Sequence, residues 1–590
     1  MKRSYIIPVL ALCVLACLSL TACGGGKEPM QTSDTALPAM TDGVTEQSTV
    51  ETEVPAVTDR EELVLVEGGK TDYLVISARA ADAGITEETR AFISDLEKKT
   101  GVKLKLYPES YTESECEIVV GMVHDRDSAV AHMKEVGYTA WGLFLDGKKV
   151  IVTAYDANGV RQALQEILRN LEEKDGKWVT HLPKETVGKT AHGAHAVPSC
   201  ESEGAYVTGI YTGVRDGIEV CLRAVKQTEY ENYGKTLTDA GWVCYTENVM
   251  GNNAFATYTH SSGKTLQLGY YPTLQSGTLR IVSTPTGYLP PTEAPVYTRV
   301  TDTTFAQLGR EAMKLNSAVG MSYVMQLADG SFIIIDGGPA NVADEDDLLA
   351  YLKSLTPAGQ KPVIAAWFIT HAHPDHMALA NRFLIRYYDQ IEIKMAAYSF
   401  PTYETVKDAS DVEKDRSKYE PMIELFIESV REYWPEAKHL ILQAGQKIYL
   451  ADVEIEVFFT HADLYPLEFT WVNHTCVSFR IKAGGKTIMM LADSEKTLCQ
   501  QMADTFGDYL KSDMLQLAHH GSNGACLDLY KRIDPDVCFW ACSQTSFETN
   551  PKQLGTADGF EFNAYIRDSS IRVREHYHSS ETTVITLVKK

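Results

Sequence analysis

Residues 370–376 have the sequence THAHPDH, which is the strongest structural signal in the chain. It directly follows VIAAWFI at 363–369, an apolar run with the length and composition of a buried strand. Histidine and aspartate are common ligands of zinc and similar ions, and packing does not explain three histidines and one carboxylate within six positions. We therefore predict a metal-binding loop at the end of this strand.

The spacing within this loop predicts two metal ions. His371 and His373 are two residues apart, so in an extended turn they project to one side and can share one ion. Asp375 and His376 lie on the next bend and can reach a second ion. We expect Zn²⁺, with Mn²⁺ as an alternative, because imidazole and carboxylate ligands suit such divalent ions.

Two further apolar runs end at candidate ligands. KTIMML at 486–491 precedes Asp493, and MLQLA at 514–518 precedes His519 and His520. Asp493 is placed to bridge the two ions. His519 immediately follows its strand and is the preferred ligand of the pair, whereas His520 is expected to face the substrate. All these candidates follow the ends of apolar runs, as expected for a site at one edge of a β-sandwich.

The segment from about 305 to 590 resembles the metallo-β-lactamase fold hydrolases. Within them it is most similar to the branch represented by the extracellular hydrolase domain of the competence protein ComEC. The similarity rests on five motifs: IIIDGG at 333–338, THAHPDH at 370–376, NHTCVSFRI at 473–481, MMLADS at 489–494 and LAHHGS at 517–522. It implies an αββα sandwich over about residues 297–590, a two-metal centre and water as the nucleophile. One departure is Ala492, because the family usually has glycine before the bridging aspartate.

The resemblance leaves two roles open. Many members have another ligand histidine before the bridging aspartate, and the candidate here is His474, but in the ComEC-like branch this position is often a polar residue that binds no metal. Ser522 could bind a phosphate or carboxylate oxygen of the substrate through its hydroxyl. Alternatively, the HGS sequence at 520–522 simply forms a tight turn that needs glycine.

The two ions define the expected reaction. A water shared between two such ions is acidified from a pKa of about 15.7 to roughly 7, which provides hydroxide at neutral pH. Asp375 would bind an ion and also orient this hydroxide, and is therefore the predicted catalytic residue. The preferred substrate is a phosphoester or phosphodiester. Two alternatives stay open: hydrolysis of a carbon ester, lactone or amide, including a β-lactam, and a surface glycan-binding protein with a vestigial metal site, against which the intact ligand set argues.

The N-terminus has the pattern of a bacterial lipoprotein signal peptide. A basic start precedes an apolar stretch at 5–20, which at about 16 residues is shorter than the roughly 20 that span a bilayer. The sequence LTAC at 20–23 resembles a lipobox, which implies removal of residues 1–22 and a lipid on Cys23. Residues 23–62 are rich in Thr, Glu, Pro and Ser and are predicted to form a flexible tether. We expect a lipid anchor in the cell membrane, on its extracytoplasmic face.

Two accessory domains are predicted between the tether and the hydrolase segment. Residues 63–190 have the strand and helix patterns of an α/β domain. They resemble the small accessory domain that precedes the barrel in bacterial hexosaminidase-type enzymes, through EIVVG at 117–121 and the stretch at 137–156. Residues 200–290 have the patterns of one helix and several antiparallel strands, which predicts a small α+β domain.

A Pro-rich linker, LPPTEAP at 289–295, precedes the hydrolase segment. We interpret His124, Asp125 and Arg126 in the first accessory domain as a solvated loop.

The composition agrees with a multidomain α/β (α+β) protein. The 590 residues are 44% hydrophobic and include 55 Lys and Arg against 79 Asp and Glu, a formal net charge of −24. This charge repels polyanions, so stable binding of nucleic acid is not expected. A small molecule or a cell-envelope component is the expected substrate, since bound metal ions supply positive charge locally.

Overall fold

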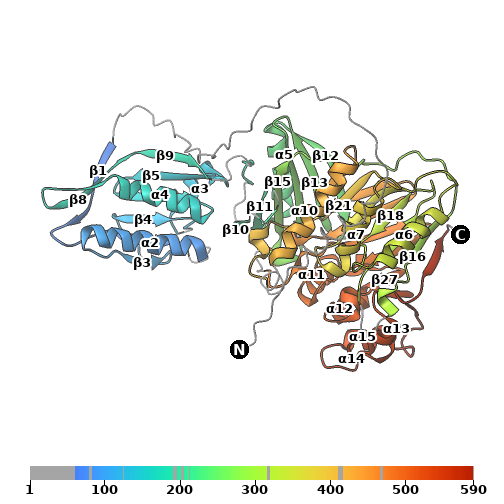
Figure 1. Ribbon diagram of the computed structural model, residues 1–590. Coiled ribbons are helices and arrows are strands. Elements are labelled where there is room, and N and C mark those ends of the chain that lie inside the picture. Colours follow the sequence, from blue (N-terminus) through green and yellow to red (C-terminus); the bar gives the residue numbers. More distant parts are fainter. Residues whose placement is uncertain are drawn as a thin grey trace, which may run out of the picture. The chain divides into compact units, whose positions relative to one another are not determined.

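The computed structural model describes residues 60–588, except 79–82, 124, 191–195, 201–204, 212, 215, 315–318, 410–415 and 466–468. These residues form a mixed α/β protein with five sheets (Figure 1), and the predicted multidomain α/β class is confirmed. The predicted signal peptide and the tether as far as residue 59 lie outside the described residues. In the part of the chain that the structure describes, no helix is long and apolar enough to cross a membrane.

The first accessory region is built on a six-stranded sheet of order β3-β2-β4-β6-β5-β9, in which β5 runs antiparallel to both of its neighbours. Its elements are β2 (Leu74–Ser77), α2 (Ala83–Thr100), β3 (Lys105–Pro108), β4 (Glu117–Val120), α3 (Asp127–Val136), β5 (Ala140–Asp146), β6 (Lys149–Ala154), α4 (Ala157–Arg169) and β9 (Glu185–Lys189). A separate antiparallel sheet of order β1-β8-β7 comprises β1 (Arg60–Glu67), β7 (Leu171–Lys174) and β8 (Lys177–Pro183).

Arg126 is buried, so the prediction of a solvated loop is wrong for this residue. Its guanidinium donates to both carboxylate oxygens of Glu117, at 2.8 and 2.9 Å. Glu117 begins β4, so the ion pair ties the loop to the sheet, and a buried charge pair of this kind needs such complete hydrogen bonding. Asp125 is exposed, as predicted, and His124 lies outside the described residues.

The second accessory region is an antiparallel six-stranded sheet of order β10-β11-β15-β14-β13-β12. Its elements are β10 (Tyr206–Tyr211), β11 (Ile218–Arg223), α5 (Gln227–Asp239), β12 (Trp242–Met250), β13 (Asn253–His260), β14 (Lys264–Tyr271) and β15 (Thr278–Pro285). Tyr233 and Leu237 of α5 pack on one face of this sheet, in a core that also contains Val220 and Ile281.

Residues 303–588 contain two larger sheets. The first has order β22-β21-β19-β18-β17-β16-β30 with β20 beside β19, and the second has order β23-β24-β25-β26-β27-β28-β29. The strands of the first sheet are β16 (Thr303–Gln307), β17 (Tyr323–Gln326), β18 (Phe332–Ile335), β19 (Val363–Ile369), β20 (Glu392–Ile393), β21 (Met395–Tyr398), β22 (Lys438–Ile441) and β30 (Thr583–Leu587). The strands of the second sheet are β23 (Lys447–Leu450), β24 (Val453–Phe459), β25 (Ser478–Ala483), β26 (Lys486–Met490), β27 (Met514–Gln516), β28 (Val537–Trp540) and β29 (Glu575–His578).

Helices cover the outer faces of these sheets, which gives the predicted αββα sandwich. The helices of this region are α6 (Val342–Ser354), α7 (Pro374–Tyr387), α8 (Tyr403–Val406), α10 (Arg416–Tyr433), α11 (Lys496–Phe506), α12 (Leu527–Ile533), α13 (Gln544–Thr549), α14 (Pro551–Leu554) and α15 (Glu561–Arg567), with short 3₁₀ turns η4 (His461–Leu464), η5 (Val472–Thr475) and η7 (Ala518–Gly521).

Two adjacent residues of β19 contact the two layers that lie on opposite faces of its sheet. Successive side chains of a strand point to opposite faces of the sheet. Phe368 therefore contacts Phe479 of the facing sheet, with ring centroids 5.4 Å apart, whereas Trp367 contacts Phe383 of α7 at 5.7 Å. The continuous apolar run at 363–369 is explained by this burial of β19 on both faces.

Arg280 of β15 joins the second accessory sheet to the sandwich. Its side chain is buried, and Nη1 donates to Glu219 Oε1 at 2.6 Å and to the carbonyl oxygen of Ala462 at 2.9 Å. Nη2 donates to the carbonyls of Asp463 and Tyr465 at 2.7 and 3.0 Å. Burial raises the pKa of Glu219 to about 7, although Arg280 acts in the opposite direction. The β10–β15 sheet and the turn at 461–465 therefore share a buried charge cluster.

We expect Arg280→Met to lower the free energy of unfolding by about 3–5 kcal/mol, because it leaves Glu219 and the carbonyls of the turn buried without their cation. Urea unfolding followed by circular dichroism measures this change. Arg299→Met is the control, since the side chain of Arg299 is 53% exposed and its ion pairs with Asp302 and Asp452, at 3.3 and 3.7 Å, are each worth at most about 1 kcal/mol. Equal stability of the two variants would contradict the anchoring role of Arg280.

Candidate metal centre

The candidate ligands lie where parallel strands of the two sheets end. His371 and His373 follow β19, and Asp493 follows β26. The next strand of the second sheet, β27, is parallel to β26 and leads into His519 and His520. The sandwich therefore brings together residues that are more than one hundred positions apart in the sequence.

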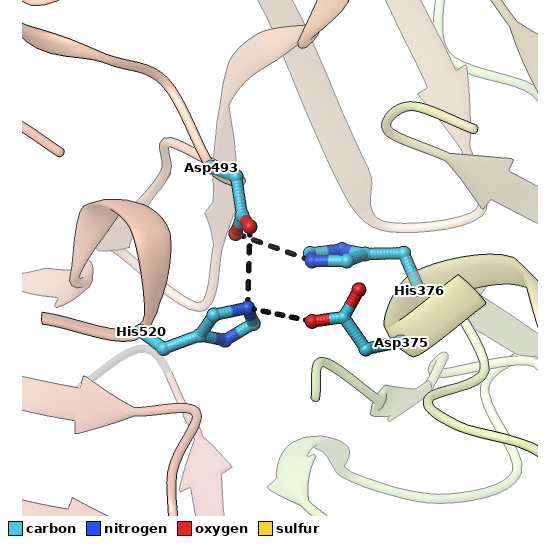
Figure 2. Close-up of side chains that lie close together, drawn as sticks. All are labelled: Asp375, His376, Asp493 and His520. Carbon is cyan, nitrogen blue, oxygen red and sulfur yellow. Dashed lines mark hydrogen bonds and ion pairs between the residues drawn. The ribbon is translucent and has the colours of Figure 1, made fainter. Parts of the chain in front are cut away.

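Helix α7 begins inside the THAHPDH motif and sets the direction of the next two ligands. Pro374 occupies its first turn, where the missing N–H costs nothing and the fixed φ favours a helix start. Asp375 and His376 lie on the same turn, and Figure 2 shows both side chains pointing toward Asp493 and His520.

The donor atoms form two groups that share one carboxylate. One group consists of Asp375, His376, Asp493 and His520, and the other of His371, His373 and Asp493, with one ligand atom of each residue within 4.8 Å of those of its group. In the first group, His376 Nε2 lies 3.2 Å from Asp493 Oδ1 (Figure 2). His520 Nε2 lies 3.1 Å from Asp375 Oδ2 and 3.2 Å from Asp493 Oδ2. Because Asp493 belongs to both groups, its carboxylate is positioned to bridge two ions.

In the second group, His371 Nε2 lies 4.0 Å from Asp493 Oδ2 and 3.1 Å from His373 Nδ1. The structure thus assigns His371 and His373 to one group and Asp375 and His376 to the other. This is the division that the spacing of the motif predicts.

His520 belongs to a donor group and His519 does not, whereas the sequence analysis preferred His519 as the ligand. His520 is buried with its Nε2 between two carboxylates. His519 Nε2 lies 3.7 Å from Asp493, belongs to neither donor group, and contacts the amide of Asn473 at 3.3 Å. The side chain of His519 is 21% exposed, whereas that of His520 is 2% exposed.

The sequence left the roles of two further residues open, His474 and Ser522. His474 belongs to neither group, and its Nε2 lies 3.6 Å from Glu495 Oε2. The hydroxyl of Ser522 accepts a hydrogen bond from Gln553 Nε2 at 3.2 Å, and the residue is half-buried. His474 therefore lies outside both donor groups, and Ser522 has a hydrogen-bond partner within the protein.

Asp336 is a site residue to which the sequence analysis assigned no role. Its carboxylate lies 2.7 Å from His376 Nδ1 and accepts bonds from the amide and the hydroxyl of Thr370, each at 2.8 Å. A carboxylate on Nδ1 fixes the orientation of the ring, so that Nε2 faces the donor group. Burial raises the pKa of Asp336, while His376 and Thr370 oppose this effect. The motif IIIDGG at 333–338 contained this residue, but nothing in the sequence connected it to His376.

Electrostatics in the centre favour protonated histidines as long as no cation is bound. Burial opposes charge on both His376 and His520. Asp493 and Asp336 outweigh this effect at His376, and Asp493 and Asp375 outweigh it at His520. They raise the pKa of His376 well above its usual range and that of His520 to about 9. Burial also opposes charge on Asp493, but the surrounding histidines hold its pKa well below the ordinary value. The pKa of His371 is lowered by burial and by the neighbouring His376 and His373, which leaves a neutral ring suited to metal binding.

The donor set fits divalent metal ions. His376 Nε2 and Asp493 Oδ1 are buried, and neither has a partner with hydrogen-bond geometry among the described residues, although they lie only 3.2 Å apart. Buried polar atoms without partners are costly unless another group satisfies them. Imidazole nitrogens and carboxylate oxygens in this arrangement suit zinc and similar ions, and metal bound between them would satisfy both atoms.

Strained backbone surrounds the centre. Asp336, Ala492, His519 and His520 have φ angles of 55°, 52°, 47° and 57°, in the left-handed region that costs a non-glycine residue roughly 1 kcal/mol or more. Ala492 stands where the family usually has glycine. Gln516 stabilises this residue, because its Oε1 accepts from the Ala492 amide at 2.7 Å and its Nε2 donates to the Ala492 carbonyl at 3.1 Å.

Comparison with known proteins agrees with this site. The profile of the Metallo-beta-lactamase superfamily matches residues 318–541, which hold every candidate ligand, and the chain therefore contains a domain of this superfamily over these residues. None of the curated proteins compared with the chain matches it.

Several solved structures are similar to parts of the chain. The metallo-beta-lactamase fold protein YhfI from Bacillus subtilis is 15% identical, with 48% of this chain and 99% of that chain covered and a TM-score of 0.29. Zn²⁺-bound PqqB from Methylobacterium extorquens is 11% identical, with 48% and 100% covered and a TM-score of 0.30. A chitobiase from Flavobacterium johnsoniae is 15% identical over 22% of this chain and 19% of its own, with a TM-score of 0.17.

We expect metal binding to release at least one proton per chain and to strengthen as the pH rises toward about 9. With their raised pKa values, His376 and His520 hold protons at neutral pH in the metal-free protein, and an ion must displace them. Titration calorimetry at about pH 6.5 and about pH 8.5, in buffers of different ionisation enthalpy, measures both effects. The same apparent Kd at both pH values would contradict this assignment.

Proposed function

We propose that the protein is an extracytoplasmic hydrolase that uses two divalent metal ions, preferably Zn²⁺, to cleave a phosphoester or phosphodiester. The observation that carries the proposal is the position of Asp493, whose buried carboxylate belongs to both donor groups. Two ions bound there would acidify a shared water and polarise the substrate oxygen. Mn²⁺ is the alternative metal.

Asp375 is the residue best placed to act on water and substrate. Its side chain is 29% exposed, whereas that of Asp493 is 2% exposed. One carboxylate oxygen accepts a bond from His520 at 3.1 Å, which fixes the plane of the carboxylate. Asp375 can therefore hold and orient an attacking water at the open side of the centre, while Asp493 stays inside it.

Polar groups beside the centre support an oxyanion such as phosphate as the substrate group. His519 is partly exposed next to Asp493, with the amide of Asn473 at 3.3 Å. The half-buried Ser522 adds a hydroxyl. Imidazole, amide and hydroxyl groups together can donate hydrogen bonds to the oxygens of a phosphoryl group. The similarity of the LAHHGS sequence at 517–522 to the ComEC-like branch supports the same substrate class.

The location outside the cytoplasm rests on the lipobox at 20–23 and the predicted tether at 23–62. If Cys23 carries the lipid, metabolic labelling with a radioactive fatty acid should label the wild-type protein but not Cys23→Ser. Equal labelling of the two proteins would contradict the proposed anchor.

A comparison of chromogenic substrates tests the reaction class. Zinc-loaded protein is assayed on bis(p-nitrophenyl) phosphate, p-nitrophenyl phosphate, p-nitrophenyl acetate and a chromogenic cephalosporin. We expect a phosphate substrate to have the highest kcat/KM and the chelator-treated protein to be inactive. A higher kcat/KM on the acetate or the cephalosporin would favour a carbon ester or β-lactam substrate and would overturn the proposed substrate class.

Asp375→Asn tests the role of this carboxylate. The substitution keeps the volume but removes the charge, so we expect kcat to fall by at least about a hundredfold, with metal in excess. The thermal midpoint should change little, because the residue lies on a partly exposed turn at the sheet edge. Full activity in a folded, metal-loaded Asp375→Asn protein would show that another residue orients the water.

A further inference from the structure

The loop that carries His520 has an unusual backbone. His519, His520 and Gly521 are three consecutive residues with left-handed φ angles of 47°, 57° and 74°. Only glycine adopts this region freely, so the surrounding contacts must hold such a run in place. The conformation matters for the metal centre because it directs His520 Nε2 toward Asp375 and Asp493.

Two buried amide side chains from the C-terminal helices hold this loop. Gln553 of α14 donates through Nε2 to the carbonyl of His520 at 3.3 Å and to the hydroxyl of Ser522 at 3.2 Å. Asn563 of α15 donates through Nδ2 to the carbonyl of Gly521 at 2.7 Å and to the carbonyl of Lys552 in α14 at 2.9 Å. The two amides are 1% and 0% exposed, and both lie beyond the residues matched by the superfamily profile.

Close packing limits the loop on another side. A Cβ added to Gly521 would lie 2.4 Å from a ring carbon of Trp540, so the indole leaves room only for glycine. The loop is therefore confined by Trp540, while Gln553 and Asn563 bind its carbonyl groups.

Each of these two amides binds the loop through its N–H group and not through its oxygen. Gln553 Oε1 and Asn563 Oδ1 are buried and have no hydrogen-bond partner within the described part of the chain. A buried oxygen without a partner is costly, and an apolar side chain of the same size would avoid that cost. The stabilisation that each amide provides must therefore come from its N–H groups, which bind carbonyls of the strained loop.

We propose that Gln553 and Asn563 are positioning residues for one ion of the centre, because they set the backbone that directs His520 into the group of Asp375, His376 and Asp493. The inference rests on the proposed function to the extent that His520 is a ligand. It assigns to the segment 551–567 a role in metal affinity in addition to its role in folding.

Gln553→Met tests this role, since it keeps the length of the side chain and removes the N–H donors. We expect the affinity for one of the two ions to fall by about 10- to 100-fold, the usual effect of losing a group that supports a ligand. The affinity for the other ion should stay within about twofold. Zinc affinities are measured by competition with a chromophoric chelator, and the visible spectrum of the Co²⁺-loaded protein reports on the geometry of the altered site.

Asn550→Ala is the matched control, because it weakens the same helix without touching the loop. Asn550 Oδ1 caps α14 by accepting from the amide of Lys552 at 3.0 Å. Loss of such a cap should lower the thermal midpoint measurably while both zinc affinities and the Co²⁺ spectrum stay as in the wild type. If Asn550→Ala weakens one ion as much as Gln553→Met does, the effect is one of general stability and the inference is overturned.

The remaining outcomes separate the inference from the proposed function. A folded Gln553→Met protein with two wild-type affinities overturns the inference alone, whereas a wild-type protein that binds no zinc overturns the proposed function first. Should Gln553→Met fail to fold, Asn563→Asp replaces it. This variant is nearly isosteric, exchanges the donor to Gly521 for an acceptor, and should weaken the same ion.

Discussion

The structure depends on the carboxylate of Asp493. It is buried at the end of β26, with His376 and His520 each 3.2 Å away and His371 at 4.0 Å. An isolated buried carboxylate is too costly to persist, so it must be paired with cations, either protonated histidines or metal ions. The raised pKa values of His376 and His520 describe the first state, and the shared donor groups describe the second.

The same requirement explains why the ligands lie on strained turns. The strands of the sandwich are rigid, and their parallel order brings several carboxyl ends to one edge, but the strand positions themselves point into the apolar layers. Left-handed backbone at Asp336, Ala492 and the 519–521 turn redirects the chain toward the centre. Three buried amides bind backbone groups at two of these sites, Gln516 at Ala492 and Gln553 and Asn563 at the 519–521 turn. The accessory sheet is tied to the same domain through Arg280, which contacts the turn at 461–465.

The sequence predicts much of this architecture, and the failures have physical causes. The apolar runs at 363–369 and 488–491 predict strands because burial on both faces leaves a continuous apolar pattern. The spacing of THAHPDH predicts the two donor groups because it depends only on local geometry. The choice between His519 and His520 could not be made from the sequence, because the turn after β27 is left-handed and the order of the two residues along the chain does not say which side chain faces Asp493. Asp336 and Arg126 are not predicted because their partners are identified only by the folded chain, at His376 and Glu117.

The role of Asp493 is tested most directly by a crystal structure of the zinc-loaded protein, with anomalous scattering measured at the zinc absorption edge. We expect two anomalous peaks on opposite sides of the Asp493 carboxylate. One peak should lie beside His371 and His373, and the other beside Asp375, His376 and His520. A single peak, or peaks that do not share Asp493, would contradict this role.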